Sequence, residues 1–256
     1  MARWIAGLDG CRGAWAGVLL DLDDPERHRA VRFARVADLM DGPETPGTVG
    51  IDVPIGLPER TTGGGRSADQ AARRLLGAGR ASVFPVPPRA ALEATDYATA
   101  KALARANSDP PRAVSIQCFN ILGYVREVDR LLRARPGLER RLHEVRPEVA
   151  FHRLNGDRRL GAVKTDPAGL DERRGLLVRA GLPPSLVASD PPRGIGRADH
   201  VDAMAALLVA REIAGGRALP LPDPPDRDAF GLPIVIWAPG GACDATLAMR
   251  LHCDDG

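Results

Sequence analysis

The sequence predicts an α/β fold built on a mixed sheet, with three antiparallel strands first and parallel strands after them. Residues 3–53 alternate apolar runs with tight turns, in the order strand, strand, strand, helix, strand. Longer segments follow in which apolar residues recur every three to four positions, the spacing of helices. We therefore expect one domain over residues 1–239, with a helical insertion at about 60–138 and a C-terminal tail at 240–256.

Composition and charge exclude several classes of protein. Hydrophobic residues make up 44% of the chain and charged residues 27%, which is typical of a globular protein rather than a disordered one. No apolar run approaches the ~20 residues of a membrane span. The chain enters its first strand too early for a signal peptide, so we expect a cytoplasmic protein without a membrane partner. The four cysteines lack the spacing of a zinc knuckle or a redox pair.

The N-terminal hairpin carries the first candidate residue. Residues 3–8 and 14–22 are predicted to form two antiparallel strands on either side of a glycine-rich turn. Asp9 ends the first strand, where a carboxylate is costly unless it is paired, hydrogen-bonded or bound to a metal. The simpler interpretation is an aspartate that accepts hydrogen bonds from the turn at Gly10–Gly13.

The next elements predict the topology of the sheet. A third strand is expected at 28–36, a short helix at 37–40 and a buried strand at 48–53. This order is how an RNase H-like sheet begins, with its fourth strand parallel to the first and beside it. Asp9 and Asp52 are then neighbours at the C-terminal ends of their strands, the edge at which open α/β sheets build their sites.

The middle of the chain is expected to be helical. Ser67 begins a capping-box pattern, which opens a helix that ends near Gly77. Prolines keep residues 82–89 extended. Helices are expected at 90–107 and 115–133, the second with one apolar face. We interpret this part of the chain as an insertion or lid on the sheet.

The C-terminal part is expected to complete the sheet and to cover it with helices. Its predicted elements are a fifth strand at 141–145, helices at 146–155, 166–181 and 199–215, a proline-rich loop at 183–196, a linker at 220–228 and a final strand at 232–237. In the last of these helices, residues 203–210 are all apolar or small. We therefore expect it to pack tightly on the sheet.

Two further aspartates stand at the start of that helix. Asp199 and Asp202 are three residues apart, so both carboxylates project from one face, although either could simply favour the helix N-terminus. Together with Asp9 and Asp52 they would form an acidic cluster that raises its own pKa values unless a divalent cation neutralises it. Oxygen ligands suit Mg²⁺ or Mn²⁺, and such ions activate water in phosphodiester cleavage.

The chain as a whole resembles an uncharacterised family of predicted RNase H-like nucleases. The matching motifs lie at Gly7–Gly13, Ile51–Pro58, Ser82–Arg89, Gln117–Asn120, Glu144–Phe151, Leu154–Gly156 and Asp199–Ala203. The last motif also resembles the Asp-x-x-Asp-Ala ending of RuvC-type resolvases. The resemblance implies metal-dependent phosphodiester cleavage, with Asp9, Asp52, Asp199 and Asp202 as metal ligands. His200 departs from the family pattern, which favours a second aspartate there.

Other polar residues have two interpretations each. Glu144 and Glu148 could approach the acidic cluster, but Glu148 also suits the first turn of a helix. His200 is either a proton shuttle or an exposed helix residue. Candidate substrate-binding residues are Arg12, Arg89, Gln117, Asn120 and Lys164, together with Arg174, for which a surface salt bridge is the simpler interpretation.

The leading hypothesis is a Mg²⁺- or Mn²⁺-dependent nuclease or phosphodiesterase that acts on a nucleic acid or nucleotide. The sequence leaves open DNA, RNA, a structured junction or a small nucleotide as the substrate, and it leaves the oligomeric state open. A catalytically inactive binding protein of the same fold is the second hypothesis. An actin- or hexokinase-like ATPase is the third, because the first turn is Asp-Gly, but that class needs a second phosphate loop, which the glycines at 63–65 do not convincingly supply.

Overall fold

A computed structural model describes residues 3–240 of the chain. Its central sheet has the strand order β3-β2-β1-β4-β7. The first three strands are antiparallel, β4 is parallel to β1 and β7 is parallel to β4, so the predicted mixed α/β sheet is confirmed. The strands are β1 (Trp4–Cys11), β2 (Ala14–Asp21), β3 (His28–Phe33), β4 (Thr48–Ile51) and β7 (Leu142–Glu144).

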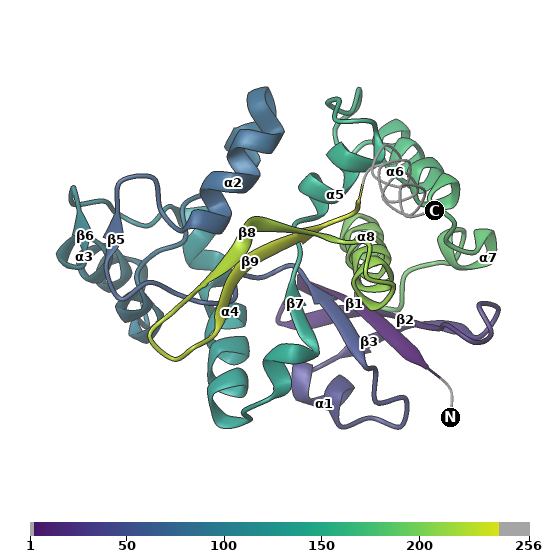
Figure 1. The fold of residues 1–256 in the computed structure, drawn as a ribbon, viewed down its shortest axis with the longest axis horizontal. Coiled ribbons are helices and arrows are strands. Elements are labelled where there is room, and N and C mark those ends of the chain that lie inside the picture. Colours follow the sequence, from purple (N-terminus) through teal and green to yellow (C-terminus); the bar gives the residue numbers. More distant parts are fainter. Residues whose placement is uncertain (1–2, 241–256) are drawn as a thin grey trace, which may run out of the picture.

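The remaining elements surround this sheet (Figure 1). The helices are α1 (Val36–Met40), α2 (Ser67–Leu76), α3 (Tyr97–Ala106), α4 (Ile116–Ala134), α5 (Pro147–Leu154), α6 (Pro167–Arg179), α7 (Pro184–Val187) and α8 (Arg197–Ala214). Short 3₁₀ helices cover Gly77–Ser82, Arg89–Glu93 and Leu138–Arg140. Two small sheets pair β5 (Thr61–Thr62) with β6 (Ser108–Asp109), and β8 (Leu219–Arg227) with β9 (Pro233–Ala238). No helix within 3–240 has the length and apolar character needed to cross a membrane.

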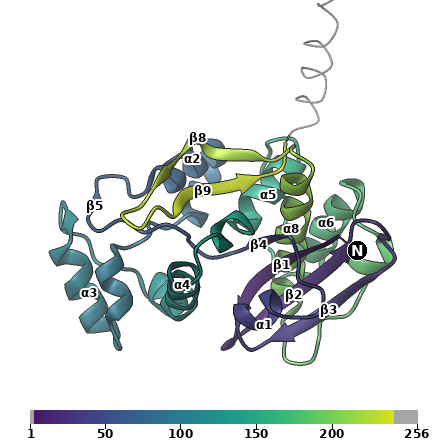
Figure 2. The ribbon, with the colours of Figure 1, turned by 60° about the horizontal axis from the view of Figure 1, so that its bottom comes forward.

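Helices cover both faces of the central sheet (Figure 2). Side chains of β2 alternate between the two faces, as a strand requires. Trp15 and Leu19 enter the core shared with α1 and α4, whereas Val18 and Leu20 enter the core shared with α5, α6, α7 and α8. The indole nitrogen of Trp15 donates to Glu127 of α4 at 3.1 Å, so α4 is joined to the sheet by a polar contact as well.

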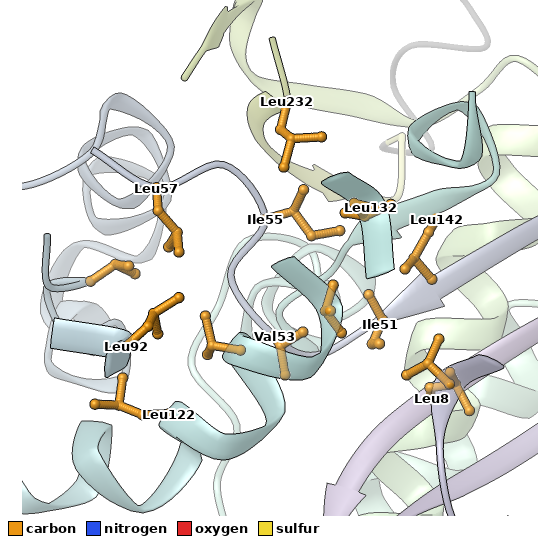
Figure 3. Close-up of a cluster of buried hydrophobic side chains, with 14 of the residues drawn as sticks. Leu8, Ile51, Val53, Ile55, Leu57, Leu92, Leu122, Leu132, Leu142 and Leu232 are labelled. Atoms are coloured by element: carbon orange, nitrogen blue, oxygen red, sulfur yellow. The ribbon is translucent and has the colours of Figure 1, made fainter. Parts of the chain in front are cut away.

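The apolar face predicted for α4 lies in the core of the sheet. Figure 3 shows Leu122 and Leu132 of α4 in one cluster with Leu8 of β1 and Ile51 of β4. Burial of each such side chain contributes about 1.5–3 kcal/mol. We therefore describe α4 as part of the main core, while α3, β5 and β6 lie further out from the sheet (Figures 1 and 2).

Two glycines let α8 lie against the sheet backbone. A Cβ atom on Gly7 of β1 would come within 2.1 Å of the Ala203 carbonyl oxygen, and one on Gly50 of β4 within 2.3 Å of the Ala206 carbonyl oxygen. Both distances are far shorter than any van der Waals contact, so neither strand could carry a side chain there without displacing α8. This close approach brings the start of α8 to the C-terminal ends of β1 and β4.

Three sequence-based predictions about local structure were wrong. The predicted linker at 220–228 is strand β8, which pairs with β9. Its prolines are tolerated because β8 pairs on one side only and its pairing with β9 is irregular between Leu221 and Asp226. Ser67 does not cap α2, because Arg66 holds the N-cap position and the Ser67 hydroxyl has no partner within 3–240. The proline-rich loop contains the short helix α7. Nearly all of the predicted C-terminal tail, residues 241–256, lies outside the described part of the chain.

Candidate metal centre

Three aspartates from three different elements meet at the C-terminal ends of β1 and β4. Asp9 lies on β1, and Asp52 directly follows β4, where its amide nitrogen donates to the Leu8 carbonyl oxygen of β1 at 3.0 Å. Asp202 lies on the second turn of α8. The predicted neighbourhood of Asp9 and Asp52 is thus present in the structure, and α8 adds Asp202 to it. We call these three residues the aspartate cluster.

Burial and mutual repulsion raise the pKa values of the aspartate cluster. The pKa of Asp9 lies well above its usual value, first because the group is buried and then because Asp52, Asp202 and Asp199 are nearby. Burial is also the largest cause of the raised pKa of Asp52 and of the rise of the Asp202 pKa to about 6. Glu148 adds to both of these rises, which places its charge in the same neighbourhood.

Two cations partly neutralise the cluster. The Lys164 Nζ lies 2.9 Å from Asp202 Oδ2, and an Arg146 guanidinium nitrogen lies 3.0 Å from Asp52 Oδ1. The second oxygen of Asp202 is buried and has no hydrogen-bond partner in the described chain. The Asp9 side chain likewise makes no hydrogen bond or ion pair with any residue from 3 to 240. The unpaired Asp202 oxygen lies in a region of low dielectric, which is costly, and Asp9 adds a second carboxylate without a partner.

These donors fit a divalent cation by their chemistry. All are carboxylate oxygens, the ligands that Mg²⁺ and Mn²⁺ prefer, and a cation would relieve the repulsion that raises their pKa values. As the side chains stand, no three His, Cys, Asp or Glu residues within 3–240 are grouped closely enough to enclose an ion. Binding would therefore require rotation of the carboxylates away from Lys164 and Arg146.

The first turn of α8 contributes Asp199 and His200 in different ways. Asp199 is half-buried, and its charge raises the pKa values of both Asp9 and Cys11, so it borders the aspartate cluster. His200 is fully buried, with Nε2 3.2 Å from the Ser189 Oγ, so the prediction that it is an exposed helix residue was wrong. Burial lowers the His200 pKa to about 4, and the imidazole is neutral at pH 7.

A second buried cluster, which we call the arginine cluster, consists of Arg66, Asp69 and Glu144. Arg66 donates to both carboxylates, at 2.7 Å in each case, and also to the carbonyl oxygens of Ile55 and Gly56. Glu144 also accepts from the Ile55 amide nitrogen. The position of Glu144, left open by the sequence, is thus within a structural ion-pair network.

Arg146 links the two clusters, because it pairs with Asp52 and lies 3.4 Å from Glu144. Sequence reasoning missed both Arg66 and Arg146. The three-residue spacing of Arg66 and Asp69 was the available signal for the first. For Arg146 the signal was its position two residues after Glu144, since alternate residues leave a strand on the same side.

Glu148 and Lys164 lie at the border of the aspartate cluster. Glu148 is in the first turn of α5 and makes long contacts of 3.3 and 3.4 Å with Arg173 of α6. The predicted role at a helix N-terminus and the predicted approach to the site are therefore both compatible with its position. Lys164, predicted to bind phosphate, is the cation already described beside Asp202.

The other predicted substrate-binding residues are more dispersed. Arg12 is exposed in the β1–β2 turn, and Gln117 and Asn120 are exposed on the first turns of α4. Arg89 is not brought to the aspartate cluster, because it forms ion pairs with Glu59, Asp129 and Asp228. Arg174 lies close enough to His200 for its charge to lower the His200 pKa.

The fold and the site together define an α/β protein with a carboxylate centre at the C-terminal ends of two inner strands of a mixed sheet. The chain belongs to the family described as "Protein of unknown function (DUF429)", whose family model matches residues 7–227. No curated protein and no solved structure matches the chain. The matched region contains every residue of the aspartate cluster and of the arginine cluster.

Proposed function

We propose that the protein is a Mg²⁺- or Mn²⁺-dependent phosphodiesterase of the nuclease class with an RNase H-like fold. The observation that carries this proposal is the convergence of Asp9, Asp52 and Asp202 with raised pKa values and unpaired oxygens. The strand order β3-β2-β1-β4-β7 supports the fold assignment. One acid, Asp9, lies near the C-terminal end of β1, a second, Asp52, directly follows β4, and a third, Asp202, lies on the last helix.

Asp9, Asp52 and Asp202 would hold the metal, with Asp199 at the border of the site. A bound divalent ion supplies an activated water and charge stabilisation for the leaving oxygen of a phosphodiester. Lys164 borders the aspartate cluster, so once separated from Asp202 it could bind a phosphate oxygen of the substrate. Arg146 would keep the Asp52 carboxylate oriented through their ion pair. Burial of Asp9 and Asp202 lowers the local dielectric and strengthens the charge interactions that these two carboxylates make.

Calorimetric titration with Mn²⁺ tests this proposal before any substrate is known. The wild-type protein is compared with Asp9→Asn/Asp202→Asn, which keeps the shapes of the side chains but removes two charges. We expect the wild type to bind Mn²⁺ and the double variant to lose binding. Asp171→Asn, at an exposed position of α6, is the matched control and should bind like the wild type. Equal binding by wild type and double variant, or none by the wild type, would contradict the proposal.

A catalytically inactive binding protein is the second candidate, and one observation favours it. Lys164 and Arg146 already neutralise two of the three aspartates, so a metal is not needed to balance their charge. This candidate predicts no Mn²⁺ binding by the wild type in the same titration. The structure offers the ATPase hypothesis no support, because Gly63, Gly64 and Gly65 connect β5 to α2 instead of joining two paired strands.

A further inference from the structure

A cavity of about 460 Å³ borders the aspartate cluster, and we call it the side pocket. It lies between the 3₁₀ turn that follows α2, the helix α5, and the loop at 159–164. Figure 1 shows α2 and α5 at the same end of the molecule. Lys164 and Glu148 line the side pocket and also act electrostatically on the aspartate cluster. The two sites are therefore adjacent.

The walls of the side pocket differ in character. One wall is apolar and is formed by Leu76, Ala81, Leu160 and Val163. Val163 is 63% exposed, which is unusual for a large hydrophobic side chain and leaves its surface available to a ligand. An apolar wall of this kind suits the flat face of a nucleobase.

The basic wall, as we call the other part of the lining, includes Arg159, Lys164 and Arg173. Lys164 pairs with Asp202, and Arg173 makes a longer contact with Glu148, which also lines the pocket. His152 of α5 also lines this wall; it is only 9% exposed and makes no hydrogen bond with any residue of the described chain. The ring nitrogens of His152 are not fully buried and have no partner in the described chain, so they are available to hydrogen-bond to a ligand in the side pocket. Arginine, lysine and histidine together are the side chains that bind phosphate.

We propose that the side pocket binds one nucleotide unit, with the base on the apolar wall and a phosphate toward His152 and the cations. This inference rests on the proposed function, because it identifies the substrate of the aspartate cluster. The volume lies within the usual range for a small-molecule site and is too small for a duplex. The substrate class is therefore a strand end or a small nucleotide, and not the interior of a double helix.

The reaction at such a unit is hydrolysis of the phosphodiester that lies between the two sites. The water oxygen bonds to phosphorus, the bond from phosphorus to the leaving sugar oxygen breaks, and one proton of the water passes to that leaving oxygen. Water is the single co-reactant. The products are a nucleotide in the side pocket and a shortened chain or alcohol.

Binding of 5′-mononucleotides in EDTA tests the side pocket separately from the metal centre. AMP and UMP are titrated into the wild type and into the Asp9→Asn/Asp202→Asn variant, so that a failed metal site does not decide the result. We expect binding in both proteins, and a loss of binding when Ala81→Trp fills the pocket. Ala81 is exposed, so this variant should fold. Ala102→Trp, exposed on α3, is the matched control and should not change binding.

His152→Ala and ribose 5-phosphate examine the two walls. We expect His152→Ala to weaken AMP binding about tenfold, the effect of one charge-assisted hydrogen bond. Ribose 5-phosphate, which lacks the base, should bind more weakly than AMP, because it cannot use the apolar wall. Absence of nucleotide binding in both proteins, or unchanged binding in Ala81→Trp, would overturn the inference even if Mn²⁺ binds.

Competition with oligonucleotides distinguishes a strand end from a free nucleotide. A linear single strand of DNA or RNA should displace AMP if strand ends enter the side pocket, whereas a covalently closed circle of the same sequence should not. If neither oligonucleotide displaces AMP, the result supports a small nucleotide as the ligand. Equal displacement by the circle and the linear strand would contradict the inference, because an interior segment would then occupy the site.

Discussion

The arginine cluster is buried, as are Asp9 and Asp202 of the aspartate cluster, but the two clusters differ in how completely their polar atoms are paired. Each nitrogen of the Arg66 guanidinium donates to a carboxylate or a carbonyl oxygen, and both carboxylates of the cluster receive its hydrogen bonds. In the aspartate cluster, Asp9 and one oxygen of Asp202 have no partner within 3–240. Burial alone therefore does not distinguish the two clusters; the pairing of their carboxylates does.

The same difference is visible in which form, charged or neutral, the pKa shifts favour. The two carboxylates beside Arg66 raise the pKa of its guanidinium, so the arginine cluster is stable in its charged form. Burial and repulsion raise the pKa values of Asp9, Asp52 and Asp202, so the aspartate cluster is strained in its charged form. One cluster stabilises the fold as it stands, and a further positive charge would stabilise the charged form of the other.

Removal of a charge should destabilise the arginine cluster strongly. Arg66→Ala leaves the buried carboxylates of Asp69 and Glu144 unpaired, and we expect a loss of about 3–5 kcal/mol in the free energy of unfolding. Urea denaturation measures the change. Arg105→Ala, exposed on α3, is the control and should stay within about 0.5 kcal/mol of the wild type. A loss below about 1 kcal/mol for Arg66→Ala would mean that the two clusters are energetically alike.

In the aspartate cluster, the negative charge of a carboxylate should lower the free energy of unfolding instead of raising it. The folded-state pKa of Asp202, about 6, is above its unfolded value, so this group favours folding at pH 4 and loses that contribution as the pH rises through 6. We expect Asp202 to account for up to about 3 kcal/mol of the stability that the wild type in EDTA loses across this window. Asp202→Asn should lose less. The comparison uses urea denaturation at pH 4 to 8.

An equal pH dependence in Asp202→Asn and in the wild type would contradict this prediction. Asp96→Asn serves as a control of the opposite kind. Hydrogen bonds from Thr99 lower the pKa of Asp96, so its contribution to stability is lost as the pH falls. Asp96→Asn should therefore leave the loss of stability between pH 4 and pH 8 unchanged.

The smallest expected effect concerns Lys164, which supplies part of the missing positive charge. If Lys164 takes the place of a metal at Asp202, Lys164→Gln should increase the affinity for Mn²⁺ about tenfold. Calorimetry measures this change directly. Lys101 is the control, because its ammonium group lies over the Tyr97 ring and the residue is far from Asp202 in the sequence. Lys101→Gln should leave the Mn²⁺ affinity unchanged. Weaker Mn²⁺ binding in Lys164→Gln would show that Lys164 assists the metal instead of competing with it.

The beginning of the sheet and its acids were predictable because their signals are local. The hairpin at β1 and β2 and the strand before Asp52 follow from apolar runs and turn residues. His200 was misjudged because α8 is buried on nearly all sides, which a one-sided helical pattern does not anticipate. Strand β8 was missed because its prolines usually indicate a loop.

The arginine cluster was missed for a different reason. Arg66 and Glu144 are 78 residues apart in the sequence, and their contact depends on how α2 is placed against β7. The side pocket shares this limitation, since its walls come from residues 76–82, 148–152 and 159–173. Sequence patterns locate single elements, whereas such sites depend on the packing of several.

The two glycines beneath α8 have a consequence for ion size. Because Gly7 and Gly50 hold the helix backbone on the strands, the Cα atoms of Asp9 and Asp202 keep a fixed separation, and only side-chain rotation adjusts the donors. In the proposed site this fixed separation would select cations by their radius, because Mg²⁺ requires short bonds of about 2.0–2.1 Å and Ca²⁺ accepts longer ones. Gly7→Ala, by moving α8 outward, would shift the preference toward the larger ion.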